Sequence, residues 1–139
     1  MWNKVLLVFF GGAVGAALRE FLMLFVANGP YGFPMSIFVA NLTAAFLIGL
    51  AASLALRGGP LDGSSKLFIS TGIMGGLSTF SSWMWGAANL LRTPSDVMSG
   101  LMFLFVSMIA GFALVELGLW LGRLFVKPPA HLPAAGGEK

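Results

Sequence analysis

The stretch that decides the fold is Thr71-Gly72-Ile73-Met74-Gly75-Gly76-Leu77-Ser78-Thr79-Phe80-Ser81-Ser82-Trp83, which holds three glycines and five hydroxyl residues within an otherwise apolar segment. A glycine weakens a helix by about 1 kcal/mol relative to alanine, and hydroxyl side chains can bind the backbone groups that a weakened helix releases. We therefore expect the helix to break between Gly75 and Trp83. Such a break survives in lipid only where protein or a polar cavity surrounds it, so it predicts a functional site. A hinge that only assists packing is the alternative.

The sequence on both sides of this stretch has the composition of a membrane protein. Of its 139 residues, 58% are hydrophobic and 9% are charged, whereas a soluble domain has about 25% charged residues. A hydrocarbon core of about 30 Å requires about 20 apolar residues per helix, and four apolar segments meet this length. We predict an all-α transmembrane domain over residues 1–127, with helices at about 4–27, 34–56, 66–91 and 97–126 and the third helix broken. Residues 128–139, rich in Pro, Ala and Gly, are predicted to be a disordered tail.

Small residues recur at four-residue spacing in three of the predicted helices. In lipid, helices associate through close backbone approach rather than through exclusion of water, and small side chains permit that approach. We therefore expect tight helix packing at the pairs Gly11 and Gly15, Gly12 and Ala16, Gly72 and Gly76, and Gly118 and Gly122.

Charge and residue content exclude several classes of function. The chain has no cysteine, and its one histidine, His131, lies in the predicted tail. No catalytic triad, phosphate loop or cluster of metal ligands is present, so we expect no enzyme activity. The net charge of +3 comes from residues at helix ends, where lysine and arginine meet lipid headgroups. We therefore expect the lipid bilayer, and not nucleic acid, as the partner, with both termini in the cytoplasm.

Six polar or aromatic residues in the predicted helices stand out. Asn41 offers two N–H donors, which suit an anion that has lost water, although a hydrogen bond between helices is the alternative. Phe80 and Trp83 share a helix face, where ring edges could hold an anion and ring faces a cation, unless they only pack in the core. Arg19 needs a partner or water at membrane depth. We expect Arg19 to pair with another helix rather than with the adjacent Glu20, which points away around the helix. Glu116 is expected to pair with Arg19 or to form a hydrogen bond across the bundle, with proton transfer as the alternative.

Three motifs resemble the Fluc (CrcB) family of fluoride channels. They are Gly11-Gly12-x-Val14-Gly15-x-x-Leu18-Arg19, Val39-x-Asn41-Leu42 and Thr71-Gly72-x-x-Gly75-Gly76-Leu77-Ser78-Thr79-Phe80-Ser81. The resemblance runs from the first predicted helix to the fourth. It implies a fluoride-selective channel that passively exports cytoplasmic fluoride across the inner (plasma) membrane. It also implies an antiparallel, dual-topology homodimer with a structural sodium ion at its centre.

The resemblance implies a role for each site residue. Backbone carbonyls of Gly75 and Ser78 from both subunits would bind the sodium ion, and Arg19 would attract anions at a vestibule. The implied fluoride pathway consists of Asn41, Phe80, Trp83, Ser81, Ser82 and Ser107.

This chain departs from the family pattern at several of these positions. Trp83 replaces a phenylalanine, which keeps an aromatic edge and adds an N–H donor that could itself contact fluoride. Gly111 and Val115 stand where relatives often continue a track of hydroxyl groups.

Two alternatives to a fluoride channel remain open from the sequence. Glu20 or Glu116 could serve a small dual-topology exporter that couples drug or cation efflux to protons. The polar groups could instead only hold helices together in a scaffold without transport activity. The basic residues are also unequally divided between the two ends, which favours one orientation in the membrane. A heterodimer with an oppositely oriented homologue is therefore the alternative to the homodimer.

Overall fold

The computed structural model describes residues 2–56 and 63–125. These residues contain no strand, so the prediction of an all-α chain is confirmed for this part of the protein. The predicted tail at 128–139 lies outside the described residues, as do residues 57–62 in the connection between the second and third predicted helices. The elements are α1 (Trp2–Phe25), η1 (Pro30–Gly32), α2 (Met35–Leu56), α3 (Gly63–Lys66), the π-helix η2 (Leu67–Ile73), α4 (Met74–Leu77), α5 (Phe80–Arg92), η3 (Pro94–Asp96) and α6 (Val97–Phe125).

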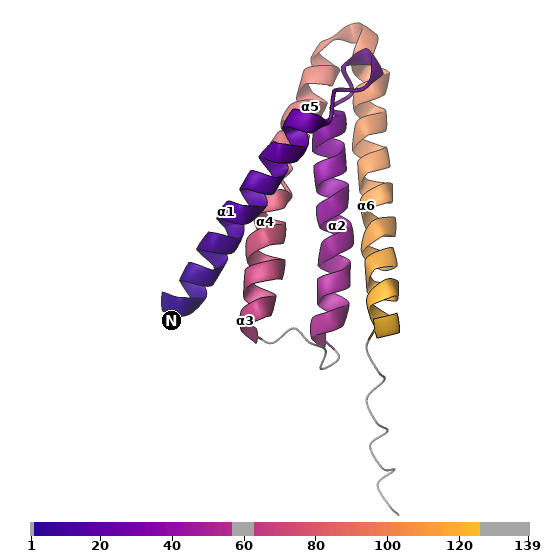
Figure 1. Cartoon of the computed structure of the whole chain (residues 1–139). Coiled ribbons are helices and arrows are strands. Elements are labelled where there is room, and N and C mark those ends of the chain that lie inside the picture. Colours follow the sequence, from indigo (N-terminus) through magenta and orange to yellow (C-terminus); the bar gives the residue numbers. More distant parts are fainter. Residues whose placement is uncertain (1, 57–62, 126–139) are drawn as a thin grey trace, which may run out of the picture.

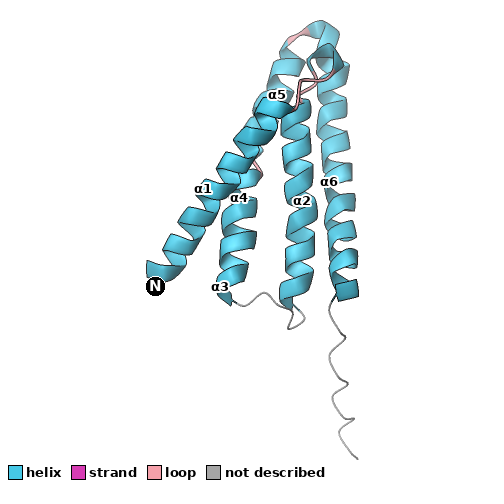
Figure 2. Cartoon of the chain, in the orientation of Figure 1, coloured by secondary structure: helices cyan, strands magenta, loops and turns pink. Residues whose placement is uncertain are grey.

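The chain traverses the long axis of the molecule four times (Figure 1). It rises along α1, descends along α2, rises again from α3 to α5, and descends along α6. The start of α1 and the end of α6 therefore lie at the same end of the bundle. Helices α2 and α6 run side by side, whereas α1 leans across the column formed by α3, η2, α4 and α5. Figure 2 shows that non-helical backbone separates α4 from α5 within this column.

The first connection is a tight turn whose backbone conformation follows from its sequence. Pro30 opens the 3-10 turn η1, and Pro34 directly precedes α2, which suits a residue that cannot continue a helix from the preceding turn. Tyr31 and Gly32 have φ angles of 57° and 71°. Glycine adopts this left-handed conformation without strain, whereas for tyrosine it is uncommon.

Within residues 2–56 and 63–125, three helical segments are long and apolar enough to cross a membrane, namely Trp2–Phe25, Met35–Ala55 and Pro94–Phe125. Their outward faces carry exposed aromatic side chains, such as Phe9, Phe105 and Phe112, as expected where lipid is the solvent. These features fit a multi-pass membrane protein. The remaining predicted span, residues 66–91, covers a column of separate elements and not a single helix.

Glycines allow α1 to lie directly on the backbone of η2 and α4. A Cβ atom added at Gly15 would overlap the carbonyl oxygen of Ile73, and one added at Gly76 would overlap that of Gly12. Gly72 approaches so closely that an added Cβ would lie 2.8 Å from the Cα of Gly11. No side chain separates the two backbones here, so this interface tolerates only glycine.

A second glycine interface joins α2 to α6. Added Cβ atoms at Gly49 and Gly118 would overlap backbone oxygens of the facing helix, and one at Gly122 would lie 2.5 Å from the Cβ of Ser53. Between the two interfaces, Ala44, Met74 and Leu77 form one buried apolar cluster. A second cluster near the turn end of the bundle consists of Ile37, Ala87, Leu90 and Phe103, with Phe33, Phe38, Trp83 and Leu104 packed against it.

The contrast between two glycines of α1 gives a test of this packing. An alanine at Gly15 meets the backbone of η2, whereas one at Gly12 meets nothing within 4 Å. We expect Gly15→Ala to lower the free energy of unfolding by about 1–3 kcal/mol, the usual cost of overpacking. Gly12→Ala should be neutral, or stabilise the helix by up to about 1 kcal/mol. Equilibrium unfolding in mixed detergent micelles measures both variants, and equal effects would contradict the described interface.

Candidate functional site

The segment between α4 and α5 consists of two extended residues. Ser78 has φ −77° and ψ 148°, and Thr79 has φ −147° and ψ 113°. Thr79 is the N-cap of α5, because its hydroxyl oxygen accepts a hydrogen bond of 3.2 Å from the backbone N–H of Ser82. Threonine is a favoured N-cap, and the two glycines at the end of α4 weaken continuation of the helix. The local sequence thus favours ending one helix at Leu77 and beginning another at Phe80.

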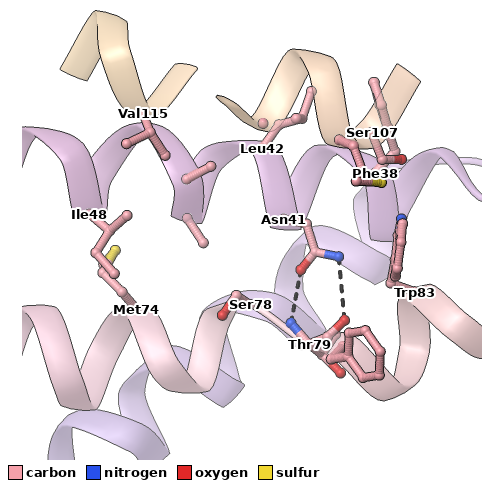
Figure 3. A pocket seen from close by; sticks show the side chains of 15 residues that line it. Phe38, Asn41, Leu42, Ile48, Met74, Ser78, Thr79, Trp83, Ser107 and Val115 are labelled. Carbon is pink, nitrogen blue, oxygen red and sulfur yellow. Dashed lines mark hydrogen bonds between the residues drawn. The ribbon is translucent and has the colours of Figure 1, made fainter. Parts of the chain in front are cut away.

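Asn41 of α2 binds both backbone groups of Thr79 (Figure 3). The N–H of Thr79 donates to Asn41 Oδ1 at 2.8 Å, and Asn41 Nδ2 donates to the carbonyl oxygen of Thr79 at 3.4 Å. Buried backbone groups without partners are costly, so this side chain stabilises the non-helical segment. One amide N–H of Asn41 therefore forms the expected hydrogen bond to a neighbouring element. The second N–H is not used in this contact, so donation to an anion stays a prediction.

Arg19 of α1 approaches the same segment from the opposite side. Its Nη1 atom donates to the carbonyl oxygen of Gly76 at 3.4 Å, in the last turn of α4. A positive charge near the carboxyl end of a helix is favourable because the free carbonyl groups there carry partial negative charge. Among the described residues no ion pair joins Arg19 to Glu20 or Glu116. A role of Arg19 at a vestibule stays a prediction.

A cavity of about 410 Å³ lies beside the 78–79 segment. Its walls come from α2, α6, the first residue of α4, the 78–79 segment and the start of α5, and they are mainly apolar (Figure 3). The structure brings five of the predicted site residues to this cavity: Asn41, Ser78, Phe80, Trp83 and Ser107. The other predicted residues do not line it: Arg19, Gly75, Ser81 and Ser82.

The hydroxyl groups near the cavity are mostly engaged with each other or with the backbone. The hydroxyl of Thr79 donates to Ser82 Oγ at 3.2 Å and lies 3.2 Å from Ser81 Oγ. Ser107 donates its only hydroxyl proton to the carbonyl oxygen of Phe103, one turn earlier in α6. The predicted hydroxyl donors therefore form two separate groups. Ser81 and Ser82 cluster with Thr79 at the start of α5, and Ser107 is hydrogen-bonded within its own helix, α6.

Two aromatic rings border the cavity in different environments. The rings of Phe80 and Trp83 are 5.8 Å apart with an angle of 44° between their planes. Phe80 is 74% exposed, whereas Trp83 packs 6.4 Å from the fully buried ring of Phe103. Phe80 is therefore loosely held, and Trp83 belongs to the edge of the apolar core.

A metal ion at this site would require backbone ligands. The described residues contain no group of three His, Cys, Asp or Glu side chains that could hold one. Around the 78–79 segment, hydrogen bonds reach the carbonyl oxygens of Met74, Gly76 and Thr79. Within the described part of the chain, none reaches the carbonyls of Gly75 or Ser78. These two oxygens are therefore free to coordinate a cation.

The sequence prediction omitted Thr79, which the structure places at the centre of these contacts. Its backbone meets Asn41 and its side chain caps α5. A threonine followed by a helix-compatible run is a capping signal, so Thr79 could have been found as an N-cap. The contact between Arg19 and Gly76 had no comparable signal, because it depends on how α1 crosses α4.

Comparison with known proteins gives a family match over most of the chain. A family model described as CrcB-like protein, Camphor Resistance (CrcB), matches residues 6–119. The chain is 49% identical over 122 residues to a protein of Yersinia pseudotuberculosis named Fluoride-specific ion channel FluC 3, and the match covers 88% of this chain and 90% of that protein.

Two further relatives carry similar names. A Thermus thermophilus protein named Fluoride-specific ion channel FluC is 39% identical over 125 residues, which cover 89% of this chain and 97% of that protein. A Brucella abortus protein named Fluoride-specific ion channel FluC 1 is 39% identical over 124 residues, covering 88% of this chain. The match spans only 46% of the Brucella protein.

The contacts of Asn41 give a prediction for the 78–79 segment. Asn41→Ala leaves the N–H and the carbonyl of Thr79 without this partner, and we expect a loss of about 1–3 kcal/mol in unfolding free energy. The amide hydrogen of Thr79 should also exchange faster with solvent. Asn28→Ala, at an exposed position in the first connection, is the matched control and should change neither quantity. Unchanged exchange at Thr79 in Asn41→Ala would argue against the described contact.

Proposed function

We propose that this chain, which belongs to the CrcB family, is a fluoride channel that passively exports the ion from the cytoplasm across the inner (plasma) membrane. The names of its relatives support a fluoride channel and give no support for an enzyme. The observation that carries the proposal is the cavity between α2, α5 and α6, where a few hydrogen-bond donors interrupt apolar walls. An anion pathway needs this combination, because donors admit the ion and weak binding lets it leave.

Fluoride imposes particular demands on such a pathway. The ion is small and strongly hydrated, so the protein must replace lost water with N–H groups, O–H groups or the positive edges of aromatic rings. Asn41 keeps one uncommitted amide N–H, and the exposed ring of Phe80 can turn its edge toward the cavity. Ser81 and Ser82 supply hydroxyl groups beside the cavity, at the start of α5.

We further propose that the column from α3 to α5 is one interrupted transmembrane span with a sodium ion at its interruption. The uncommitted carbonyls of Gly75 and Ser78 fit this role, since sodium prefers oxygen ligands and no acidic cluster of the described residues competes for it. When bound, the ion would contribute positive charge near the anion pathway and hold the non-helical backbone together.

The proposed assembly is an antiparallel dimer. The column from α3 to α5 has a face with exposed Thr71, Gly75 and Ser78, and a Cβ atom added at Gly75 would meet nothing within 4 Å. Polar groups and uncommitted carbonyls at membrane depth need protein or water around them, and small residues allow close approach. A second copy packed on this face would meet both needs. Pairing with an oppositely oriented homologue is the alternative.

The competing exporter hypothesis requires an acidic residue in the pathway. Glu20 and Glu116 are both exposed on the outer surfaces of α1 and α6, and neither lines the cavity. Their positions therefore favour the channel over proton-coupled efflux.

The transport proposal is tested with purified protein in lipid vesicles. The protein should discharge a fluoride gradient and leave a chloride gradient intact, as measured with ion-selective electrodes. Phe80→Ile removes the ring edge and should slow fluoride efflux by roughly two- to tenfold, if the edge contact resembles an aromatic pair in strength. Phe105→Ile, at an exposed position of α6, is the control and should behave as wild type. Equal fluoride and chloride rates would refute the channel proposal, and efflux abolished by Glu20→Gln would favour the exporter.

The dimer proposal is tested with single cysteines, because the chain has none. Asn28→Cys and Ser95→Cys lie in the two connections at the same end of the bundle. A membrane-impermeant maleimide should label one fraction of each variant in intact cells and the rest only after the membrane is opened. Labelling from one side alone would count against the antiparallel homodimer and favour a heterodimer with an oppositely oriented homologue.

A further inference from the structure

The cavity has polar residues on its walls but few protons to offer an anion. Its polar lining residues are Asn41, Ser78, Thr79, Trp83 and Ser107. The hydroxyl protons of Thr79 and Ser107 go to Ser82 and to the carbonyl of Phe103, and one amide N–H of Asn41 goes to Thr79. The uncommitted hydrogen-bond donors among these residues are therefore one amide N–H of Asn41, the exposed hydroxyl of Ser78 and the indole N–H of Trp83.

The wall formed by α6 contributes no free donor. It presents Ser107, Gly111 and Val115 to the cavity, and the only hydroxyl among them is committed to its own helix. Its oxygen offers lone pairs, which repel an anion. A donor that faces this wall must come from another element.

Trp83 supplies such a donor. Its Nε1 atom is buried and has no hydrogen-bond partner among the described residues. Figure 3 shows the nitrogen-bearing end of the indole directed toward α6, on the side where Ser107 lies. The indole ring packs 6.4 Å from the fully buried ring of Phe103, and the exposed ring of Phe80 lies 5.8 Å away. Buried polar groups are nearly always paired, and an unpaired one reduces stability, so a partner that arrives during function would satisfy this N–H.

We propose that the indole N–H of Trp83 donates a hydrogen bond to the fluoride ion as the ion passes the wall formed by α6. This inference rests on the proposed fluoride channel. An indole N–H is only a donor and has no lone pair that would repel an anion. Fluoride is the smallest halide and the strongest hydrogen-bond acceptor among them, so a well-placed donor gains more from fluoride than from chloride and offsets part of the larger dehydration cost of fluoride.

The surroundings of Trp83 define how the ion reaches it. Nε1 is closed to bulk water in this conformation, and the neighbouring ring of Phe80 is 74% exposed. An ion that already lies in the cavity therefore reaches Nε1 only when the side chains packed around the indole shift. The donor therefore serves a partly dehydrated ion and is not accessible to the hydrated ion outside.

The test separates the N–H group from the bulk of the ring. Incorporation of benzothienylalanine at position 83 replaces the indole N–H by sulfur and keeps the shape of the side chain. Trp83→Phe removes both the N–H and part of the bulk. Trp85→Phe, two residues along α5 and 65% exposed, is the matched control. Fluoride efflux from vesicles is measured for all four proteins, and the indole ¹H–¹⁵N resonances of the wild type are followed during titration with fluoride and with chloride.

We expect the benzothienylalanine variant to lose fluoride efflux by roughly tenfold or more, as for loss of a hydrogen bond to an ion, while Trp85→Phe keeps wild-type rates. The resonance of Trp83, assigned through its absence in Trp83→Phe, should shift with fluoride and not with chloride. A wild type that conducts fluoride with a silent Trp83 resonance, or a benzothienylalanine variant with unchanged efflux, overturns the role of Trp83 and leaves the channel intact. A wild type that does not conduct fluoride refutes the channel itself.

Discussion

The hydrogen bonds between Asn41 and the backbone of Thr79 are the interaction on which the rest of the site depends. In a membrane no water is available to replace the partners of an interrupted helix, so a non-helical residue must obtain them from the protein. The Asn41 carboxamide binds both backbone groups of Thr79, and the carbonyl oxygen also accepts from the backbone N–H of Trp83 at 3.3 Å. Because its backbone is satisfied, Thr79 can adopt an extended conformation and use its side chain to begin α5. The direction of α5, and with it the placement of Phe80 and Trp83, follows from this contact.

The 78–79 segment is held from two sides by chemically different groups. On the side of α2, the neutral amide of Asn41 binds the backbone of Thr79. On the side of α1, the guanidinium of Arg19 donates to the carbonyl oxygen of Gly76 in the last turn of α4. Neither contact uses Gly75 or Ser78, whose carbonyls remain available. The same arrangement leaves one N–H of Asn41 for the cavity. Structural support and the proposed contact with the ion would therefore use different N–H groups of the Asn41 amide.

The sequence predicted the fold class, the family and all of the polar residues that line the cavity except Thr79, because composition and the glycine and hydroxyl motifs are local properties. It could not predict which partner each polar group finds. Asn41 stood out as a polar residue in an apolar helix, but its bond to Thr79 depends on the register between α2 and α4. Ser107 was expected to donate to the ion, whereas its proton turns back to Phe103. Spacing also did not distinguish Gly12, whose Cβ direction is open, from the closely packed Gly15.

The contact of α1 with η2 and α4 has a mechanical consequence. It is made of backbone atoms at Gly11, Gly15, Gly72 and Gly76, and backbone atoms have no rotamers through which a contact can relax. The contact therefore holds α1, η2 and α4 in one fixed relation to each other. The ring of Phe80, at the start of α5 and 74% exposed, is not locked by packing in this way. The structure thus combines a stiff backbone contact with an aromatic side chain beside the cavity whose rotamer can change.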